Sequence, residues 1–215
     1  SMRKNFGAKA FSHPQPVFII ATYIDDGSAD AMNAAWGGAV NKITNVNNVN
    51  ITADASGSDD GWAYGMYTRD GWGASTQNII ENTDSAITVV ITAKAGTAGQ
   101  AYAMYGNAGG MNLIQGGSHA GDAHGDSITL NGDIGGHNNT VNTGSGDDHI
   151  EINGSLRSGT NTFNMGDGND LFTLNGNIAG GTNKIVMGTG DSHVNINGDV
   201  TGGSTSISLG AGNDV

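Results

Sequence analysis

The segment GSGDDHIEINGSLRSGTNTFNM (144–165) is followed without a gap by GDGNDLFTLNGNIAGGTNKIVM (166–187) and by GTGDSHVNINGDVTGGSTSISL (188–209). The three segments align residue for residue, so the chain carries a 22-residue period. Each segment begins with Gly-x-Gly and contains one Asn-Gly pair. A fixed period without insertions indicates one structural unit per repeat, stacked on the unit before it.

Five apolar columns run through these repeats. Within a repeat, apolar residues are spaced i, i+2, as at Ile150 and Ile152, which is the alternation of a strand and not the period of a helix. Gly-x-Gly and Asn-Gly supply turns between the strands. We therefore predict an all-β fold: a parallel β-solenoid, of the β-roll or β-helix type, with 22-residue coils about 4.8 Å apart. Ile150, Phe172 and Val194 should stack directly on one another.

The chain divides into three zones. The regular repeats occupy 131–215, and 39–130 holds irregular repeats, in which AYGMY (63–67) is echoed by AYAMY (101–105). Residues 1–38 have a different character. We expect this first zone to form a β-hairpin cap on the first coil, because repeats that pair with one another leave it no other partner.

Composition narrows the function classes. The chain has 20 Asp and Glu against 8 Lys and Arg, a net charge of −12, which argues against a nucleic-acid partner and suits cation binding or an extracellular surface. It has no cysteine, so it has no disulfide, zinc-thiolate site or thiol nucleophile. No apolar run reaches the length of a membrane span. These features favour a bacterial protein that is extracellular or on the cell surface.

The turns Gly-x-Gly-[Asp/Asn]-Asp carry the candidate metal site. GSGDDHIEI (144–152) and GDGNDLFTL (166–174) resemble the nonapeptide of repeats-in-toxin proteins, which bind calcium in a parallel β-roll. The resemblance implies oxygen ligands from stacked turns. The implied ligands are the carboxylates of Asp126, Asp148, Asp170 and Asp214 and the carbonyls of Gly144, Gly146, Gly166 and Gly168.

Two departures from that pattern leave an alternative open. The third repeat has Ser192 in place of the key Asp, and the Asn-Gly turn of each repeat lacks the Asp altogether. The turns are therefore either calcium sites or calcium-free corners in which Asp and Asn cap their own backbone. For the Asn-Gly turns we predict a stacked amide ladder, formed by Asn131, Asn153, Asn175 and Asn197.

The N-terminal zone shows a second resemblance. KNFGAKAF (4–11) and PVFIIATYIDDGSADAMNAAWGG (16–38) resemble the start of flavin reductase-like, FMN-binding split-barrel proteins of the flavoredoxin type. The resemblance implies a hairpin, a cytoplasmic location and FMN contacts from Asn33, Ala34, Ala35 and Trp36. We expect no stoichiometric FMN and no flavin reduction, because the remaining strands of a closed barrel are not visible in the chain.

Two functions therefore compete. The first is a non-enzymatic repeat segment of a secreted or cell-surface bacterial protein, adhesin-like and calcium-binding if the turns hold the ion. The second is an FMN-binding oxidoreductase. A group of aromatic residues either packs the wider coils or forms a surface patch for a glycan or another surface partner; it comprises Trp62, Trp72, Tyr64, Tyr67, Tyr102 and Tyr105.

Overall fold

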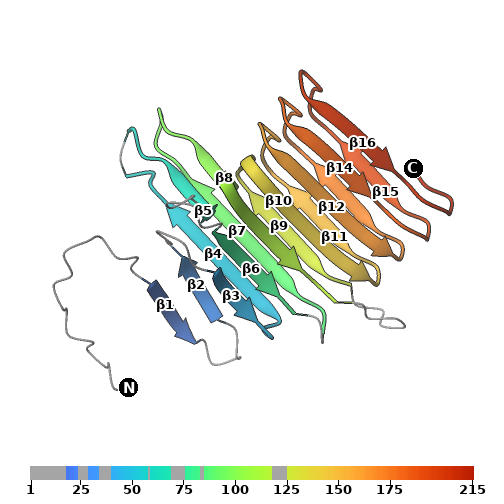
Figure 1. Cartoon of the computed structure of the whole chain (residues 1–215), viewed down its shortest axis with the longest axis horizontal. Helices are drawn as coiled ribbons and strands as arrows, with labels where there is room; N and C mark the ends of the chain where they lie inside the picture. The colour runs from blue at the N-terminus through green and yellow to red at the C-terminus, as the bar shows by residue number, and fades with distance from the viewer. Residues whose placement is uncertain are drawn as a thin grey trace.

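The computed structural model describes residues 18–23, 29–33, 40–57, 59–68, 76–82, 85–117 and 125–215. Within these residues the regular structure consists of strands, and the strands lie in two sheets. Figure 1 shows the strands side by side in two layers, from β1 at the N-terminal end to β15 and β16 at the other end. The all-β class that the sequence predicts is confirmed.

Each layer is one sheet with a simple order. The first sheet runs β1 (Phe18–Tyr23), β2 (Ala29–Asn33), β4 (Asn48–Asp54), β7 (Thr88–Lys94), β9 (Ser127–Asn131), β11 (His149–Ile152), β13 (Leu171–Leu174) and β15 (His193–Ile196). The second runs β16 (Ser204–Ser208), β14 (Thr182–Val186), β12 (Thr160–Asp167), β10 (Asp133–Ser145), β8 (Ala101–Gln115), β6 (Gln77–Glu81) and β3 (Val40–Thr44), and β5 (Ala63–Thr68) also pairs with β8.

From β9 onward the chain alternates between the two sheets, and neighbouring strands are parallel. Residues that pair across neighbouring strands of the regular repeats are 22 positions apart, which is the period of the sequence. In the first sheet Ile150 lies opposite Phe172, and Phe172 lies opposite Val194. In the second sheet Phe163 lies opposite Ile185. The predicted stacking of the Ile150 column is confirmed.

The irregular repeats join the same two sheets with larger offsets. In the first sheet Asn48 pairs with Thr88, and Thr88 pairs with Ser127. In the second sheet both β5 and β6 pair with β8, and Tyr64 lies opposite Tyr102. The echo between AYGMY and AYAMY is thus a direct pairing of two parallel strands. Some of the extra residues form β5, which pairs with the first part of β8, whereas β6 pairs with the last part.

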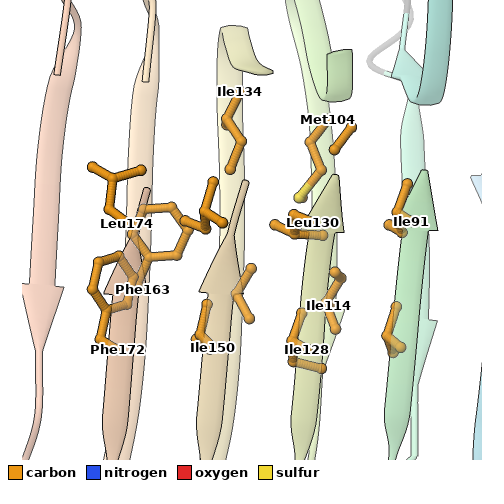
Figure 2. Close-up of a cluster of buried hydrophobic side chains, with 14 of the residues drawn as sticks. Ile91, Met104, Ile114, Ile128, Leu130, Ile134, Ile150, Phe163, Phe172 and Leu174 are labelled. Carbon is orange, nitrogen blue, oxygen red and sulfur yellow. The ribbon is translucent and has the colours of Figure 1, made fainter. Parts of the chain in front are cut away.

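The core lies between the two layers. In β13 Phe172 and Leu174 are fully buried, whereas Leu171 and Thr173 remain partly exposed, as strand alternation requires. The rings of Phe163 and Phe172 come from opposite layers, and their centroids are 5.2 Å apart. Figure 2 shows these side chains meeting between the ribbons, with Ile150 and Ile128 further along the row of Phe172. Each repeat therefore adds a thin slice of core that its neighbours must cover.

Glycine sets how closely successive turns approach. Gly166 has φ of +96°, a conformation that L side chains rarely adopt. A Cβ atom at Gly166 would overlap the carbonyl oxygen of Gly144 in the preceding repeat. The first glycine of the Gly-x-Gly turn is thus required by both its dihedral angle and its neighbour.

The N-terminal zone contributes a hairpin. β1 and β2 pair in antiparallel register, with Phe18 opposite Asn33, and β2 pairs in parallel with β4 through Ala29 and Val49. The hairpin therefore extends the first sheet beyond β4 and covers the edge that β4 would otherwise present. This is the position that a cap on the repeats requires.

The core column at Ile185 offers a matched test of this packing. Ile185 and Ile207 occupy equivalent positions in β14 and β16, but Ile185 is fully buried and Ile207 is 43% exposed. Ile185→Ala should lower the free energy of unfolding by about 2–5 kcal/mol, the usual cost of such a deletion in a core. Ile207→Ala should cost clearly less, because it leaves a smaller cavity. Urea denaturation measures both, and equal costs would contradict the packing described.

Candidate functional site

A column of aspartates runs through the Gly-x-Gly turns. Asp126, Asp148 and Asp170 each stand one residue before a strand of the first sheet, and Ser192 takes the equivalent place before β15. All four side chains are buried, at no more than 2% exposure. Asp214, the next member, is partly exposed. The acids predicted as calcium ligands are therefore brought into one column, and their side chains lie inside the turns.

Each member of this column hydrogen-bonds the backbone of the repeat before it. Oδ1 of Asp148 accepts the N–H of Asp126 at 2.7 Å, and Oδ1 of Asp170 accepts the N–H of Asp148 at 3.0 Å. The Ser192 hydroxyl accepts the N–H of Asp170 at 3.1 Å, and Oδ1 of Asp214 accepts that of Ser192 at 3.0 Å. The Oδ1 atoms of this column therefore bond the backbone of a neighbouring repeat. The side chains tie successive repeats together.

The second oxygen of Asp170 is the chemically informative atom. Oδ2 is buried and has no hydrogen-bond partner in the structure. Burial of the side chain is the main cause that raises the pKa of Asp170 to about 7. The nearby carboxylates, first Asp148 and then Asp147 and Asp167, raise it too, against the effect of the bond from the Asp148 N–H. The protonated form is thus favoured up to neutral pH.

Ser192 shows what the column position demands. Its hydroxyl accepts one backbone N–H and also donates to the carbonyl of Gly168 in the preceding repeat, at 3.2 Å. The position therefore offers one donor and one acceptor. A protonated carboxyl group satisfies both, whereas a carboxylate can only accept. The residue of the preceding repeat that is equivalent to Gly168 is Gly146, and we therefore expect Asp170 to carry a proton on Oδ2 that the Gly146 carbonyl can accept.

The geometry also bears on calcium. A calcium ion needs six to eight oxygen ligands, and one oxygen of each acid in the column is already engaged by a backbone N–H. Within the described residues, no three His, Cys, Asp or Glu side chains are grouped so that they could hold a metal ion. Both the proton on Oδ2 of Asp170 and calcium binding at this turn stay predictions.

The same turns carry a second ladder, at the surface. Asp147 Oδ1 accepts the N–H of Asn169 at 2.8 Å, Asn169 Oδ1 accepts that of Asp191 at 2.9 Å, and Asp191 Oδ1 accepts that of Asn213 at 2.8 Å. Asp and Asn alternate, so like charges are two repeats apart and repel less. The backbone and side-chain bonds from Asn213 lower the pKa of Asp191. The alternation of Asp and Asn at every 22nd residue is the signal in the sequence that could have predicted this ladder.

The predicted amide ladder at the Asn-Gly turns is confirmed. The Nδ2 of Asn153 donates to Oδ1 of Asn131 at 2.9 Å, that of Asn175 to Asn153 at 2.7 Å, and that of Asn197 to Asn175 at 2.8 Å. The ladder continues into the irregular repeats, where Asn131 donates to the Thr92 hydroxyl at 3.1 Å. These side chains link successive repeats along the stack.

A buried amide ladder was missed at sequence level. It runs through the second sheet at bond lengths of 2.8–3.0 Å and comprises Asn78, Asn112, Asn139, Asn161 and Asn183. Asn161 also donates to the carbonyl of Ser158, and Asn183 to that of Gly180. The signal was an Asn two residues before an apolar strand position in each repeat, as at Asn161 and Phe163.

The remaining predicted site residues fall in two places. Asn33 ends β2, while Ala34, Ala35 and Trp36 lie outside the described residues, so the FMN contacts stay a prediction. Of the aromatic group, Tyr64, Tyr67, Tyr102 and Tyr105 form one cluster on β5 and β8 with Trp62 beside it, and Trp72 lies outside the described residues.

Comparison of the chain with family models, with curated proteins and with solved structures finds no match. Among the described residues, no helix has the length and apolar character needed to span a membrane.

The Asp170 column predicts that stability falls as pH rises. The folded-state pKa of Asp170, about 7, lies above the ordinary value near 4 that applies to the unfolded chain. The stabilisation is therefore complete below about pH 4 and is lost as pH rises through 7, by up to about 4 kcal/mol. Urea denaturation between pH 5 and 8, in chelator, measures this. A flat or rising profile would contradict a proton on Asp170.

Asp170→Asn is the matched variant. Asparagine keeps an acceptor and supplies an uncharged donor, so this variant should flatten the pH profile and match or exceed the wild type at pH 8. The control is Asp191→Asn at the surface, which should keep the wild-type slope. A parallel series with added calcium tests the other prediction, since a calcium site would stabilise the wild type at pH 8 and Asp170→Asn would abolish that gain.

Proposed function

We propose that the chain is a non-enzymatic repeat segment of a secreted or cell-surface bacterial protein, adhesin-like, and that its two sheets are the faces of one β-solenoid with 22-residue coils. The observation that carries the proposal is the set of side-chain ladders. The Asp170 column, the Asp147 ladder and the Asn153 ladder each bind one repeat to the next. Polar side chains that would form a pocket in an enzyme are used here to extend a stack.

The surface supports an exported location. The chain is acidic and has no cysteine, and its exposed turns carry Asp and Asn in alternation. Such a surface stays solvated without relying on a reducing compartment. A stack of repeats holds a binding surface away from its point of attachment, which is what an adhesin requires.

Calcium has a defined place in this proposal. If the turns bind calcium, the ion must replace the proton that we expect on the buried Oδ2 of Asp170. The calcium series described above then decides between a calcium-stabilised and a proton-stabilised stack. The FMN-binding alternative has the β1–β2 hairpin in its favour, and it predicts visible flavin absorbance in the purified chain.

The solenoid is tested by adding a repeat. Duplicating residues 166–187 should give a folded protein that is longer by about 4.8 Å, one strand spacing, and more stable, because one more nearest-neighbour interface is formed. X-ray scattering measures the length, and thermal unfolding measures the stability. The matched control inserts only 166–176, half a repeat, which places strands of the first sheet against the second. If both insertions are tolerated equally, the proposed coil is wrong.

The adhesin-like role is tested by display. The chain should retain a non-adherent bacterium, or a coated bead, on a glycan-bearing surface such as mucin. Retention should persist in Asp170→Asn, which keeps the stack. If displayed chain that is folded by circular dichroism gives no retention on any surface tried, the adhesin-like function is wrong even where the solenoid stands.

A further inference from the structure

We propose that a groove beside Trp62 binds a neutral oligosaccharide, an inference that rests on the adhesin-like function proposed above and names its partner. The groove has a volume of about 470 Å³, within the usual range for small-molecule sites. It lies where β7 and β9 end and β8 begins. Gln100, Asn131 and Asn153 contribute amides to its lining, and Asp133 and Arg157 an ion pair.

The polar groups of the groove suit sugar hydroxyls. Each hydroxyl both donates and accepts, and adjacent hydroxyls on a pyranose ring form a pair that a planar amide, carboxylate or guanidinium can meet with two bonds. The amide ladder uses one donor and one acceptor of Asn131, which leaves a second N–H and a second lone pair. Asn153, fully at the surface, is used in the same way. The lining is therefore held in place and still has hydrogen-bonding capacity.

An exposed aromatic residue, Trp62, neighbours Gln100, which is one of the residues that line the groove. The Ala63 N–H donates to the Gln100 carbonyl at 3.0 Å, which places Trp62 next to Gln100 where β5 and β8 begin to pair. The Trp62 side chain is 50% exposed, and its ring centroid is 6.3 Å from that of Tyr64. A large exposed indole beside a polar groove provides a flat apolar face on which the C–H groups of a sugar ring can stack.

Trp62 adjoins a cluster of four tyrosines through Tyr64. Tyr64 stacks on Tyr102 at 5.7 Å between ring centroids, and Tyr67 stacks on Tyr105 at 5.9 Å. The Tyr102 hydroxyl also bonds Oε1 of Gln100, which lines the groove, at 2.6 Å. The aromatic cluster and the groove thus share Gln100. A rigid aromatic platform reduces the conformational entropy lost when a ligand binds.

The charges favour a neutral sugar over an acidic one. Arg157 pairs with Asp133, and Lys94, which also lines the groove, lies 3.9 Å from Asp54. The local charges therefore cancel in pairs. The chain as a whole carries a net charge of −12, so a polyanionic glycan would be repelled.

Calorimetric titration of the whole chain with three neutral probes, cellohexaose, chitohexaose and mannohexaose, tests the inference, with hexagalacturonate as the acidic comparison. At least one neutral hexaose should bind. Trp62→Ala should weaken binding about tenfold or more, equivalent to 1.4 kcal/mol, and Trp62→Phe should restore part of the loss. Circular dichroism confirms that each variant is folded.

A matched pair separates the groove from the stack. Asn153 and Asn197 belong to the same surface ladder, but only Asn153 lines the groove. Asn153→Ala should weaken binding severalfold, and Asn197→Ala should leave it unchanged. Binding of none of the neutral probes, binding of hexagalacturonate alone, or equal behaviour of the two variants would overturn the proposal. If the displayed Trp62→Ala variant is still retained on mucin, the proposal that the groove binds the glycan is wrong, and the adhesin-like function still stands.

Discussion

The structure depends on one constraint: backbone N–H groups in the turns between two thin sheets are removed from water and must find acceptors. The strands solve this problem by pairing, and some corner amides also bond a backbone carbonyl of the next repeat, as Gly168 does with Thr189, whereas other corner amides bond a side chain. At Asp126 and Asp148 the acceptor comes from the side chain of the equivalent residue one repeat further on. A repeat is thus completed by its successor, both in its core and at its corners, which is why no single repeat could be stable alone.

This constraint accounts for the unusual composition. Equivalent turn residues of successive repeats lie one strand spacing apart, so a short polar side chain can accept the N–H of the neighbouring repeat. Asp, Asn and Ser occupy these turn positions. Stacked carboxylates repel, and the surface ladder alternates Asp147 with Asn169. In the buried column the pKa of Asp170 is raised to about 7, and Ser192 stands in place of an acid in the next repeat. Glycine occurs where neighbouring turns touch, as at Gly166. The arrangement of Asp, Asn and Ser along the stack therefore reduces the repulsion between carboxylates of neighbouring repeats.

Much of this architecture could be predicted from the period. Two apolar i, i+2 pairs per repeat predict two sheets, and a constant 22-residue spacing leaves one register, so the partners of Phe172 were predictable. The inward direction of Asp170 was not, because a turn residue can equally face water, and only the buried N–H of Asp148 decides it. Asn161 was missed because Asn is depleted in strands and signals a turn. The groove was missed because Gln100 and Arg157 stand outside the periodic columns and meet only in three dimensions.

Hydrogen exchange at individual amides tests the central claim most directly. The N–H groups of Asp126, Asp148 and Asp170 stand in turns, yet side chains of the following repeat accept them inside the protein. The account predicts that these three amides exchange as slowly as the strand amide of Phe172, through global unfolding. Exchange at the rate of exposed turn amides would mean that the side chains do not cap the neighbouring repeat, and would contradict the account.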